Sequence, residues 1–301
     1  MTIGFIGLGN MGRGMAEILA AQTLTLRVFD LDRGAMAALV EKGAQSVAAI
    51  EDLGDCDVII TMLPAGPQVK ETTQALSQAL NQTLSQGTPK LFIDCSTIAV
   101  DEARERHATL ADQGHTFVDA PVSGGVAAAA AGRLTFMVGA KGALFDRVAG
   151  ILGPMAANIF SAGGPGNGQA AKIANNMLLG ISMLGTCEAF NLAERLGLDA
   201  QTFYDISSKA SGQCWSMTSY CPAPGPVEGA PSNADYAPGF SIAMMLKDLN
   251  LSQDAATGAQ ALTPMGQAAQ KHYQWLVDSG YGPLDFSLPF DLLKKDDSYG
   301  P

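Results

Sequence analysis

The chain has 301 residues, of which 47% are hydrophobic and 16% charged, so it can bury a sizeable core as one large domain or two smaller ones. Its formal net charge of −11 argues against binding to nucleic acid, which requires clustered Lys and Arg. No uninterrupted apolar stretch reaches the length of about 18 residues that a membrane span needs, so we expect no membrane partner.

The cysteines and histidines lack the spacing of a disulfide framework or a metal site. None of the five cysteines belongs to a C-x-x-C pair, which is typical of reduced thiols in a cytosolic protein. They are Cys56, Cys95, Cys187, Cys214 and Cys221. His107, His115 and His272 are dispersed, so we expect structural roles for them and no bound metal. A strand is expected from Ile3, which leaves no room for a targeting segment and predicts a cytoplasmic protein.

The first half of the chain alternates apolar runs with helical patterns. The predicted strands are Ile3–Ile6, Leu26–Phe29, Val58–Met62, Leu91–Asp94, Thr116–Asp119 and Leu134–Val138. Helical patterns lie between them, for example at Met11–Ala21, Arg33–Lys42 and Asp101–Gln113. This alternation predicts an α/β Rossmann domain, a doubly wound and mostly parallel sheet with helices on both faces.

The strand signal ends at a turn-rich run, Ser161–Gly168. Gln169–Leu196 then has the pattern of one long apolar helix, roughly 40 Å at 1.5 Å per residue. Further helices are expected at Ala200–Ser208, Ile242–Gly258, Pro264–Gly280 and near Phe290, with a Pro- and Gly-rich loop at Cys221–Pro238. We therefore predict a Rossmann domain over residues 1–163, followed by a long connecting helix and an all-α domain over residues 164–301. Because the long helix is too apolar for one small domain to cover, a homodimer or homotetramer is expected.

A glycine-rich fingerprint, Gly7-Leu8-Gly9-Asn10-Met11-Gly12, follows the first predicted strand and opens the first helix. The three glycines permit a tight turn, close approach of the backbone to a pyrophosphate, and contact between helix and strand. The second strand leads to Asp30, 23 residues after Gly7, where a carboxylate would bind the ribose 2′-hydroxyl. It would repel the 2′-phosphate of NADP, so NAD is the predicted cofactor. The alternative is that Asp30 and Asp32 are helix N-cap residues.

Lys172 is the only Lys, Arg, Asp or Glu between Arg147 and Glu188, and it lies near the start of the long apolar helix. Asn175 and Asn176 follow at i+3 and i+4, on the same helical face. A helix this apolar is expected to be buried, where an ammonium group is costly unless it has partners. The pattern favours a polar catalytic face that opens onto a cleft. The alternative is a lysine that extends to solvent.

A second candidate polar segment, Phe117–Gly125, begins in a predicted strand and continues past its end. This end lies at the edge of the sheet where doubly wound folds bind ligands. Ser123 can donate a hydrogen bond, and the successive N–H groups of Gly124 and Gly125 can form an anion-binding concavity. Lys247 heads a Lys-Asp-Leu sequence on a predicted helix. It would approach the nicotinamide end of the site, or pair with Asp248 at the surface.

Four motifs in matching order, spread over nearly the whole chain, resemble those of the β-hydroxyacid dehydrogenases. They are Gly7–Gly12, Asp119–Gly125, Lys172–Asn176 and Lys247–Leu249. Three further segments resemble most the branch of that family that oxidises 3-hydroxyisobutyrate, a step of valine degradation. These segments are Ser211–Ser216, Pro222–Gly225 and Lys247–Asp254.

The resemblance implies a cleft between a Rossmann domain and a helical domain, with a small hydroxyacid as substrate. It implies that Lys172 is the catalytic residue and that Asn176 orients this lysine or the substrate. The substrate site would be formed by Ser123, Gly124, Gly125, Asn175 and Trp215. The NAD site would be completed by Leu63, Pro64, Gln68, Thr97 and Lys247. Gln68 departs from the family pattern, which has the shorter Asn there.

In such an enzyme a hydride passes from the CH₂OH carbon to the nicotinamide while the hydroxyl loses a proton. Burial and the positive nicotinamide ring would favour a neutral Lys172 amine, which can take that proton. Whether Lys172 is a base or a donor to a developing alkoxide stays open. Cys214 and Trp215 favour a methyl-bearing substrate. The alternatives are a sister enzyme such as a tartronate semialdehyde reductase, an inert NAD-binding module, and a structural subunit that binds NAD only for stability.

Overall fold

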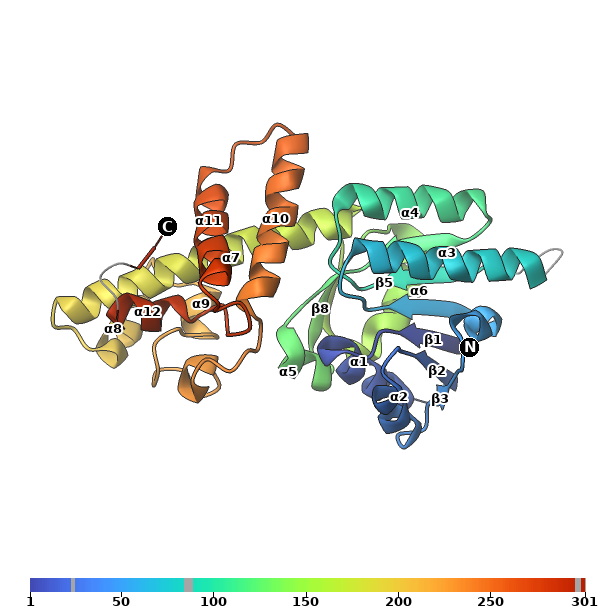
Figure 1. The fold of residues 1–301 in the computed structure, drawn as a ribbon, viewed down its shortest axis with the longest axis horizontal. Helices are drawn as coiled ribbons and strands as arrows, with labels where there is room; N and C mark the ends of the chain where they lie inside the picture. The colour runs from blue at the N-terminus through green and yellow to red at the C-terminus, as the bar shows by residue number, and fades with distance from the viewer. Residues whose placement is uncertain (23–24, 84–88, 296–298, 301) are drawn as a thin grey trace. The chain divides into compact units, whose positions relative to one another are not determined.

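The computed structural model describes residues 1–22, 25–83, 89–295 and 299–300. The chain divides into two compact units, Met1–Lys172 (unit 1) and Ile173–Pro301 (unit 2) (Figure 1). The long helix α7 (Asn167–Arg195) contributes its first turns to unit 1 and the rest to unit 2.

Unit 1 contains a six-stranded parallel sheet in the order β3-β2-β1-β4-β5-β6, which confirms the predicted Rossmann arrangement. Its strands are β1 (Thr2–Ile6), β2 (Thr25–Phe29), β3 (Gln45–Ser46), β4 (Val58–Thr61), β5 (Leu91–Asp94) and β6 (Thr116–Asp119). Strands β4 and β5 are buried at every residue, because helices cover both faces of the sheet. The strand order reverses beside β1, and ligands of doubly wound sheets bind at such a point.

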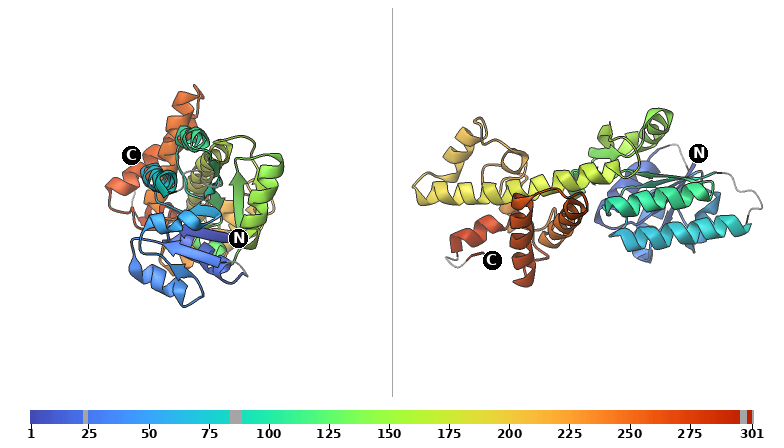
Figure 2. Two further views of the ribbon diagram at one scale, coloured as in Figure 1. Left: turned by 90° about the vertical axis from the view of Figure 1, so that its right-hand side faces the viewer. Right: turned by 90° about the horizontal axis from the view of Figure 1, so that it is seen from above.

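The two faces of this sheet carry separate hydrophobic cores beneath separate helices (Figures 1 and 2). On one face Phe5 packs with Met15 of α1 and Leu39 of α2. On the other, Phe92 packs with Leu76 of α3. The helices of this layer structure are α1 (Asn10–Ala20), α2 (Arg33–Val40), the 3-10 helix η1 (Ile50–Asp55), α3 (Gly66–Thr83) and α4 (Val100–Asp112).

A second, three-stranded sheet completes unit 1, in the order β7-β8-β9. Its elements are β7 (Val122–Ser123), α5 (Gly125–Ala130), β8 (Leu134–Val138), α6 (Gly142–Leu152), η2 (Gly153–Met155) and β9 (Ala156–Ser161). The predicted strand at Leu134–Val138 therefore exists but lies outside the main sheet, antiparallel to β7 and parallel to β9. The sequence does not predict β9, because four of its six side chains are exposed and give no apolar alternation.

Unit 2 is helical, as predicted. Besides most of α7 it contains α8 (Ala200–Ser207), α9 (Trp215–Thr218), η3 (Pro231–Ala234), α10 (Ile242–Gly258), α11 (Pro264–Asp278) and α12 (Pro289–Lys295). Its core joins Met183 and Phe190 of α7 to Leu249 of α10 and Tyr273 of α11. Within the described ranges, no helix combines the length and the apolar character that crossing a membrane would require.

Candidate active site

The glycine fingerprint, which runs from the end of β1 into α1, requires glycine at two positions. Gly7 has a φ of +95°, and a Cβ at Gly7 would collide with the carbonyl oxygen of Met62. A Cβ at Gly12 would collide with the carbonyl oxygen of Gly7. Gly9 differs from both, because it is exposed and a Cβ there would meet nothing within 4 Å. The loop therefore leaves its outer side open at Gly9, as close approach of a pyrophosphate requires.

The N-terminus of α1 fits the same ligand. The helix begins at Asn10 with no side-chain cap on its first N–H groups and no acidic residue in its first turn. Such a terminus favours phosphate oxygens. Leu8 and Met11 pack into the core of unit 1, and Asn10 is exposed.

Asp30 follows β2 and is tied to the glycine loop. Its Oδ2 accepts a hydrogen bond of 2.5 Å from the backbone N–H of Leu8, and its Oδ1 accepts one of 2.7 Å from that of Asp32. Asp32 is the N-cap of α2, since its carboxylate accepts a bond of 2.8 Å from Gly34 N–H. The N-cap alternative therefore describes Asp32, whereas Asp30 holds the fingerprint loop.

A buried carboxylate organises the loops that follow β4 and β5. Asp94 is fully buried at the end of β5. Its Oδ1 accepts hydrogen bonds of 2.8 Å from Thr61 Oγ1 and 2.6 Å from Ser96 Oγ. Burial raises the pKa of Asp94 to about 6, against the opposing effect of these bonds. Ser96 Oγ in turn accepts a bond of 2.9 Å from Leu63 N–H, so the two loops are joined.

Three other residues expected at the NAD site lie around these loops. Pro64 is exposed just after Leu63, Gln68 is exposed in the first turn of α3, and Thr97 is half-buried next to Ser96. Apart from Gln68 on α3 and Lys247 on α10, the predicted cofactor residues come from four segments of unit 1: the glycine loop with the start of α1, the end of β2, and the loops after β4 and β5.

Ser123, Gly124 and Gly125 lie at the junction of β7 and α5. Gly124 and Gly125 have φ values of +134° and +73°, which residues with a Cβ rarely adopt. A Cβ at Gly124 would also lie 2.7 Å from the Cβ of Ala128. Ser123 is half-buried and Gly124 is exposed, so the turn can offer a hydroxyl and backbone N–H groups to a small anion.

The polar residues near the start of α7 differ in burial. Lys172 is 7% exposed and Asn176 is 2% exposed, so this lysine does not extend to solvent. Asn175 is exposed, and its Nδ2 donates a bond of 3.0 Å to Asn176 Oδ1. The buried polar pair is therefore Lys172 and Asn176, at i and i+4 of one helix.

In unit 2, Asn176 is held by a carboxylate on α10. Asn176 Nδ2 donates a hydrogen bond of 2.5 Å to Asp248 Oδ2, and Lys247 Nζ lies 3.8 Å from Asp248 Oδ1. Asp248 is buried, whereas Lys247 is half-buried. The expected pairing of Lys247 with Asp248 is present, but its acidic partner is not at the surface.

Trp215, also expected to contact substrate, is the first residue of α9. The residue is 48% exposed, and its ring stacks on that of Tyr220 with a centroid distance of 5.0 Å. Tyr220 is fixed by a bond of 2.7 Å from its hydroxyl to Asp285.

Two family comparisons cover nearly the whole chain. Residues 2–164 match the family described as the NAD binding domain of 6-phosphogluconate dehydrogenase. Residues 166–293 match the family described as NAD-binding of NADP-dependent 3-hydroxyisobutyrate dehydrogenase. The chain belongs to the β-hydroxyacid dehydrogenase family. As a member it is an oxidoreductase that binds a nicotinamide dinucleotide.

Relatives within this family carry more than one substrate name. The mitochondrial 3-hydroxyisobutyrate dehydrogenase of Drosophila melanogaster is 42% identical over 98% of this chain and 90% of its own length. The NAD-dependent L-serine dehydrogenase of Pseudomonas aeruginosa is 42% identical over 95% of both chains. The solved structure of Mycobacterium tuberculosis 3-hydroxyisobutyrate dehydrogenase with L-serine is 42% identical, covers 97% of this chain and 99% of its own, and has a TM-score of 0.89.

Four buried polar residues were not among those predicted to form the cofactor or substrate site: Asp94, Asp119, Gln169 and Asp248. Asp94 and Asp119 both end buried strands of the parallel sheet, and a carboxylate at that position is a signal that the sequence does contain. Asp248 stands next to Lys247 in the Lys-Asp-Leu sequence. Gln169 carries no local signal, because its side-chain partners are 71 and 73 residues away.

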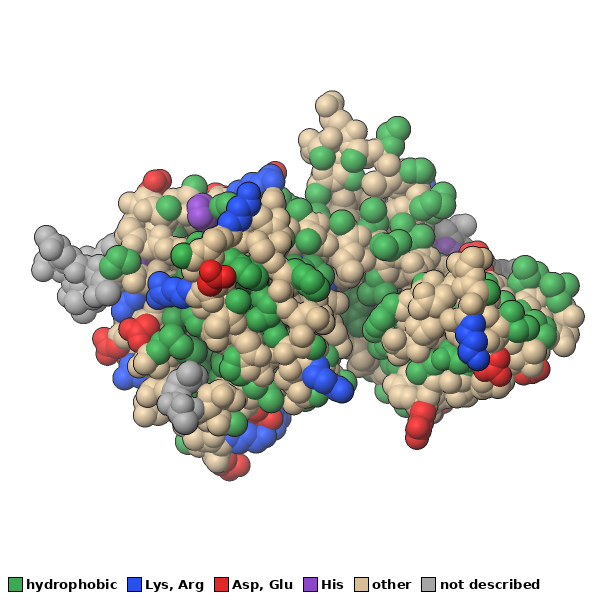
Figure 3. Space-filling model, turned by 180° about the vertical axis from the view of Figure 1, so that it is seen from behind, with side chains coloured by type: hydrophobic (Ala, Val, Ile, Leu, Met, Phe, Trp, Pro, Cys, Tyr) green, Lys and Arg blue, Asp and Glu red, His purple; other side chains and the backbone are tan. Residues whose placement is uncertain are grey.

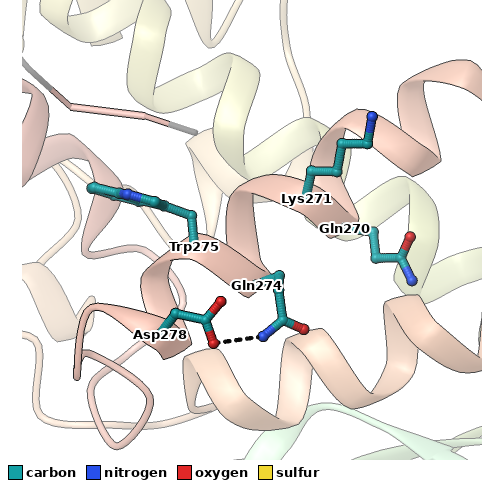
Figure 4. A pocket seen from close by; sticks show the side chains of 5 residues that line it. All are labelled: Gln270, Lys271, Gln274, Trp275 and Asp278. Atoms are coloured by element: carbon teal, nitrogen blue, oxygen red, sulfur yellow. Dashed lines mark hydrogen bonds between the residues drawn. The ribbon is translucent and has the colours of Figure 1, made fainter.

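A cavity of about 450 Å³ lies along α11. Its lining residues are Gln270, Lys271, Gln274, Trp275 and Asp278. These residues lie on one face of α11, and Gln274 Nε2 donates a hydrogen bond of 2.8 Å to Asp278 (Figure 4). No residue predicted for the active site lines it. Among the described residues, no three His, Cys, Asp or Glu side chains are placed to hold a metal ion.

Proposed function

We propose that the chain oxidises 3-hydroxyisobutyrate to methylmalonate semialdehyde with NAD, and that Lys172 handles the hydroxyl proton. The observation that carries this proposal is the burial of the Lys172 amine, one helical turn before Asn176. A buried lysine in a stretch of helix with no other charge favours a chemical role, because buried ionisable groups cluster at functional sites. The Drosophila and Mycobacterium relatives, both named for 3-hydroxyisobutyrate, support the substrate.

When bound, the oxidised nicotinamide supplies the acceptor for the hydride that leaves the CH₂OH carbon. Lys172 takes the hydroxyl proton through a neutral amine or, as an ammonium, donates to the developing alkoxide. Asn176 orients this lysine or the substrate hydroxyl. The Ser123 hydroxyl and the N–H groups of Gly124 and Gly125 hold the carboxylate, which keeps the reacting carbon in place.

NAD is the proposed cofactor rather than NADP because of Asp30. Its carboxylate accepts one bond at each oxygen from the backbone, which leaves further lone pairs for a ribose 2′-hydroxyl. A 2′-phosphate would meet this fixed negative charge.

L-Serine is the second candidate substrate, because the Pseudomonas relative is named for it and the Mycobacterium structure contains it. It shares the CH₂OH and carboxylate groups but carries an ammonium group where 3-hydroxyisobutyrate carries a methyl group. The partly exposed Trp215 ring favours the methyl group.

Initial rates with NAD and 3-hydroxyisobutyrate, L-serine or glycerate test the proposal. We expect kcat/KM for 3-hydroxyisobutyrate to exceed that for L-serine by about tenfold or more, since a pocket shaped for a methyl group desolvates an ammonium group without a partner. Equal or faster oxidation of L-serine would replace the proposed substrate. Binding of NADH without oxidation of any hydroxyacid would indicate an inert module.

We also propose that the chain forms a homodimer or homotetramer through unit 2. Leu178 and Leu192 are 63% and 60% exposed, fourteen residues apart on α7, which is close to four helical turns. On the face drawn in Figure 3, unit 2 presents many hydrophobic and few charged side chains. A second copy would cover such an apolar stripe.

A further inference from the structure

Gln169 lies fully buried in the first turn of α7, three residues before Lys172. Its Nε2 donates a hydrogen bond of 2.8 Å to the carbonyl oxygen of Ser96, and its Oε1 accepts one of 3.2 Å from the N–H of Ile98. These two backbone groups flank Thr97. One side-chain amide therefore forms hydrogen bonds with the loop after β5 on both sides of Thr97, which is expected to contact the cofactor.

The turn that carries Gln169 is itself fixed to the sheet. Asp119, the last residue of β6, accepts bonds of 2.9 Å from the N–H groups of Gly166 and Gln169, one at each carboxylate oxygen. A Cβ on Gly168 would collide with the carbonyl oxygen of Met137. The first turn of α7 thus has little freedom to shift against β6.

The loop after β5, which Gln169 binds, is also hydrogen-bonded to the loop after β4. Ser96, whose carbonyl oxygen Gln169 binds, accepts a hydrogen bond from Leu63 N–H through its hydroxyl and donates one to Asp94. Gln169 therefore links this pair of loops to the helix turn that bears Lys172, and all of these residues belong to unit 1.

We propose that Gln169 is a positioning residue. It fixes the position of the loop that contains Thr97 relative to the turn of α7 that carries Lys172. The inference rests on the proposed function, in which this loop contacts NAD and Lys172 handles the proton. Loss of the Gln169 amide should therefore affect cofactor binding and turnover together. An amide that only satisfied buried backbone groups would affect stability alone.

The variant Gln169→Met tests this, because Met keeps the length of the side chain but forms neither hydrogen bond. The matched control is Gln253→Met on α10. Gln253 is also buried, its Oε1 accepts a bond of 2.8 Å from Thr263, and its Nε2 donates one of 3.3 Å to Ser252. Both variants should lose thermal stability, since each removes two hydrogen bonds of a buried side-chain amide.

Two quantities separate the variants. We expect Gln169→Met to raise the Kd for NADH, measured by titration without substrate, by about fivefold or more, and to lower kcat at saturating NAD by about tenfold or more. Gln253→Met should leave both within about twofold of the unmodified chain. If Gln169→Met does not fold, Gln169→Asn provides the same test, because the shorter amide cannot reach both backbone groups.

The proposal would be overturned if Gln169→Met had a Kd for NADH and a kcat like those of Gln253→Met. A change in only one of them would overturn it as well, since the proposal joins the loop to the helix turn. The kcat measurement uses whichever hydroxyacid the unmodified chain oxidises, and the NADH titration requires no hydroxyacid. Failure of 3-hydroxyisobutyrate as substrate is therefore distinguishable from failure of the role proposed for Gln169.

Discussion

The side-chain amide of Asn176 donates a hydrogen bond of 2.5 Å to the carboxylate of Asp248, and so ties α7 to α10 within unit 2. The other carboxylate oxygen of Asp248 faces Lys247 Nζ at 3.8 Å. The buried carboxylate of Asp248 therefore contacts two proposed site residues. Asn176 is proposed to orient Lys172 or the substrate, and Lys247 is proposed to bind the cofactor.

Replacement of Asp248 should separate these two contacts. Asp248→Ala removes the acceptor of a buried amide, which costs about 1–3 kcal/mol, and we expect kcat to fall by about tenfold. Asp248→Asn keeps an acceptor for Asn176 but removes the charge that faces Lys247. It should behave like Lys247→Ala, with a raised KM for cofactor or substrate at least as large as its loss in kcat. Steady-state kinetics of the three variants provide the check, and identical profiles for Asp248→Ala and Lys247→Ala would contradict a role for the Asn176 contact.

Asp30 should decide between the two dinucleotides. We expect kcat/KM with NAD to exceed that with NADP by about tenfold or more, because a fixed carboxylate repels the 2′-phosphate. Asp30→Ala should shrink this ratio, chiefly by raising the KM for NAD. Loss of the bond to Leu8 N–H should also loosen the glycine loop. Equal use of NAD and NADP by the unmodified chain would refute the assignment.

The buried carboxyl of Asp94 should make stability depend on pH. Its pKa is about 6 in the folded chain, raised by burial from an ordinary value of 3.8. Between these two values the unfolded chain releases a proton that the folded chain keeps, so the free energy of unfolding falls as pH rises through this window. This loss of stability is absent below pH 3.8 and complete above about pH 6.

Asp94→Asn cannot ionise and should escape this cost. Its free energy of unfolding relative to the unmodified chain should rise between pH 4 and pH 7, by up to about 3 kcal/mol. Urea unfolding at several pH values measures the difference. The new amide adds a constant penalty, so only the trend is diagnostic, and a difference that does not vary with pH would exclude Asp94 as the source.

The exposed leucines of α7 should hold copies of the chain together. Light scattering at micromolar concentration should give at least twice the 31.2 kDa mass of one chain. Leu192→Glu places a charge in the apolar stripe and should shift the protein towards the monomer. Phe160→Glu, at an exposed apolar residue of β9 in unit 1, is the control and should leave the mass unchanged. A monomeric unmodified chain would contradict the proposed assembly.

The sequence predicts elements whose burial leaves a local pattern. Strand β4 is buried on both faces and has a continuous apolar run. The long apolar pattern at the end of the turn-rich segment predicts each end of α7 to within two residues. Strand β3 is two exposed residues long, and β9 is largely exposed, so neither has such a pattern.

The same reasoning explains what the sequence indicates about the candidate site. Lys172 is conspicuous because no other charge surrounds it, and the glycine fingerprint has a fixed spacing. Gln169 and Asp248 depend instead on partners about 70 residues away, Ser96 and Ile98 for the first and Asn176 for the second. Only the fold brings such partners together, and no local periodicity reports them.

The turnover number of Lys172→Ala with NAD and 3-hydroxyisobutyrate tests the central claim most directly. We expect kcat to fall by roughly 10² to 10⁴, the usual effect of a positioned acid–base group. The Kd for NADH should stay unchanged, because the glycine fingerprint and Asp30 lie on other elements. Lys90→Ala, which removes another buried lysine of unit 1, should keep its kcat. A Lys172→Ala protein with near-normal kcat would mean that the buried polar face of α7 is structural and that the proposed mechanism is wrong.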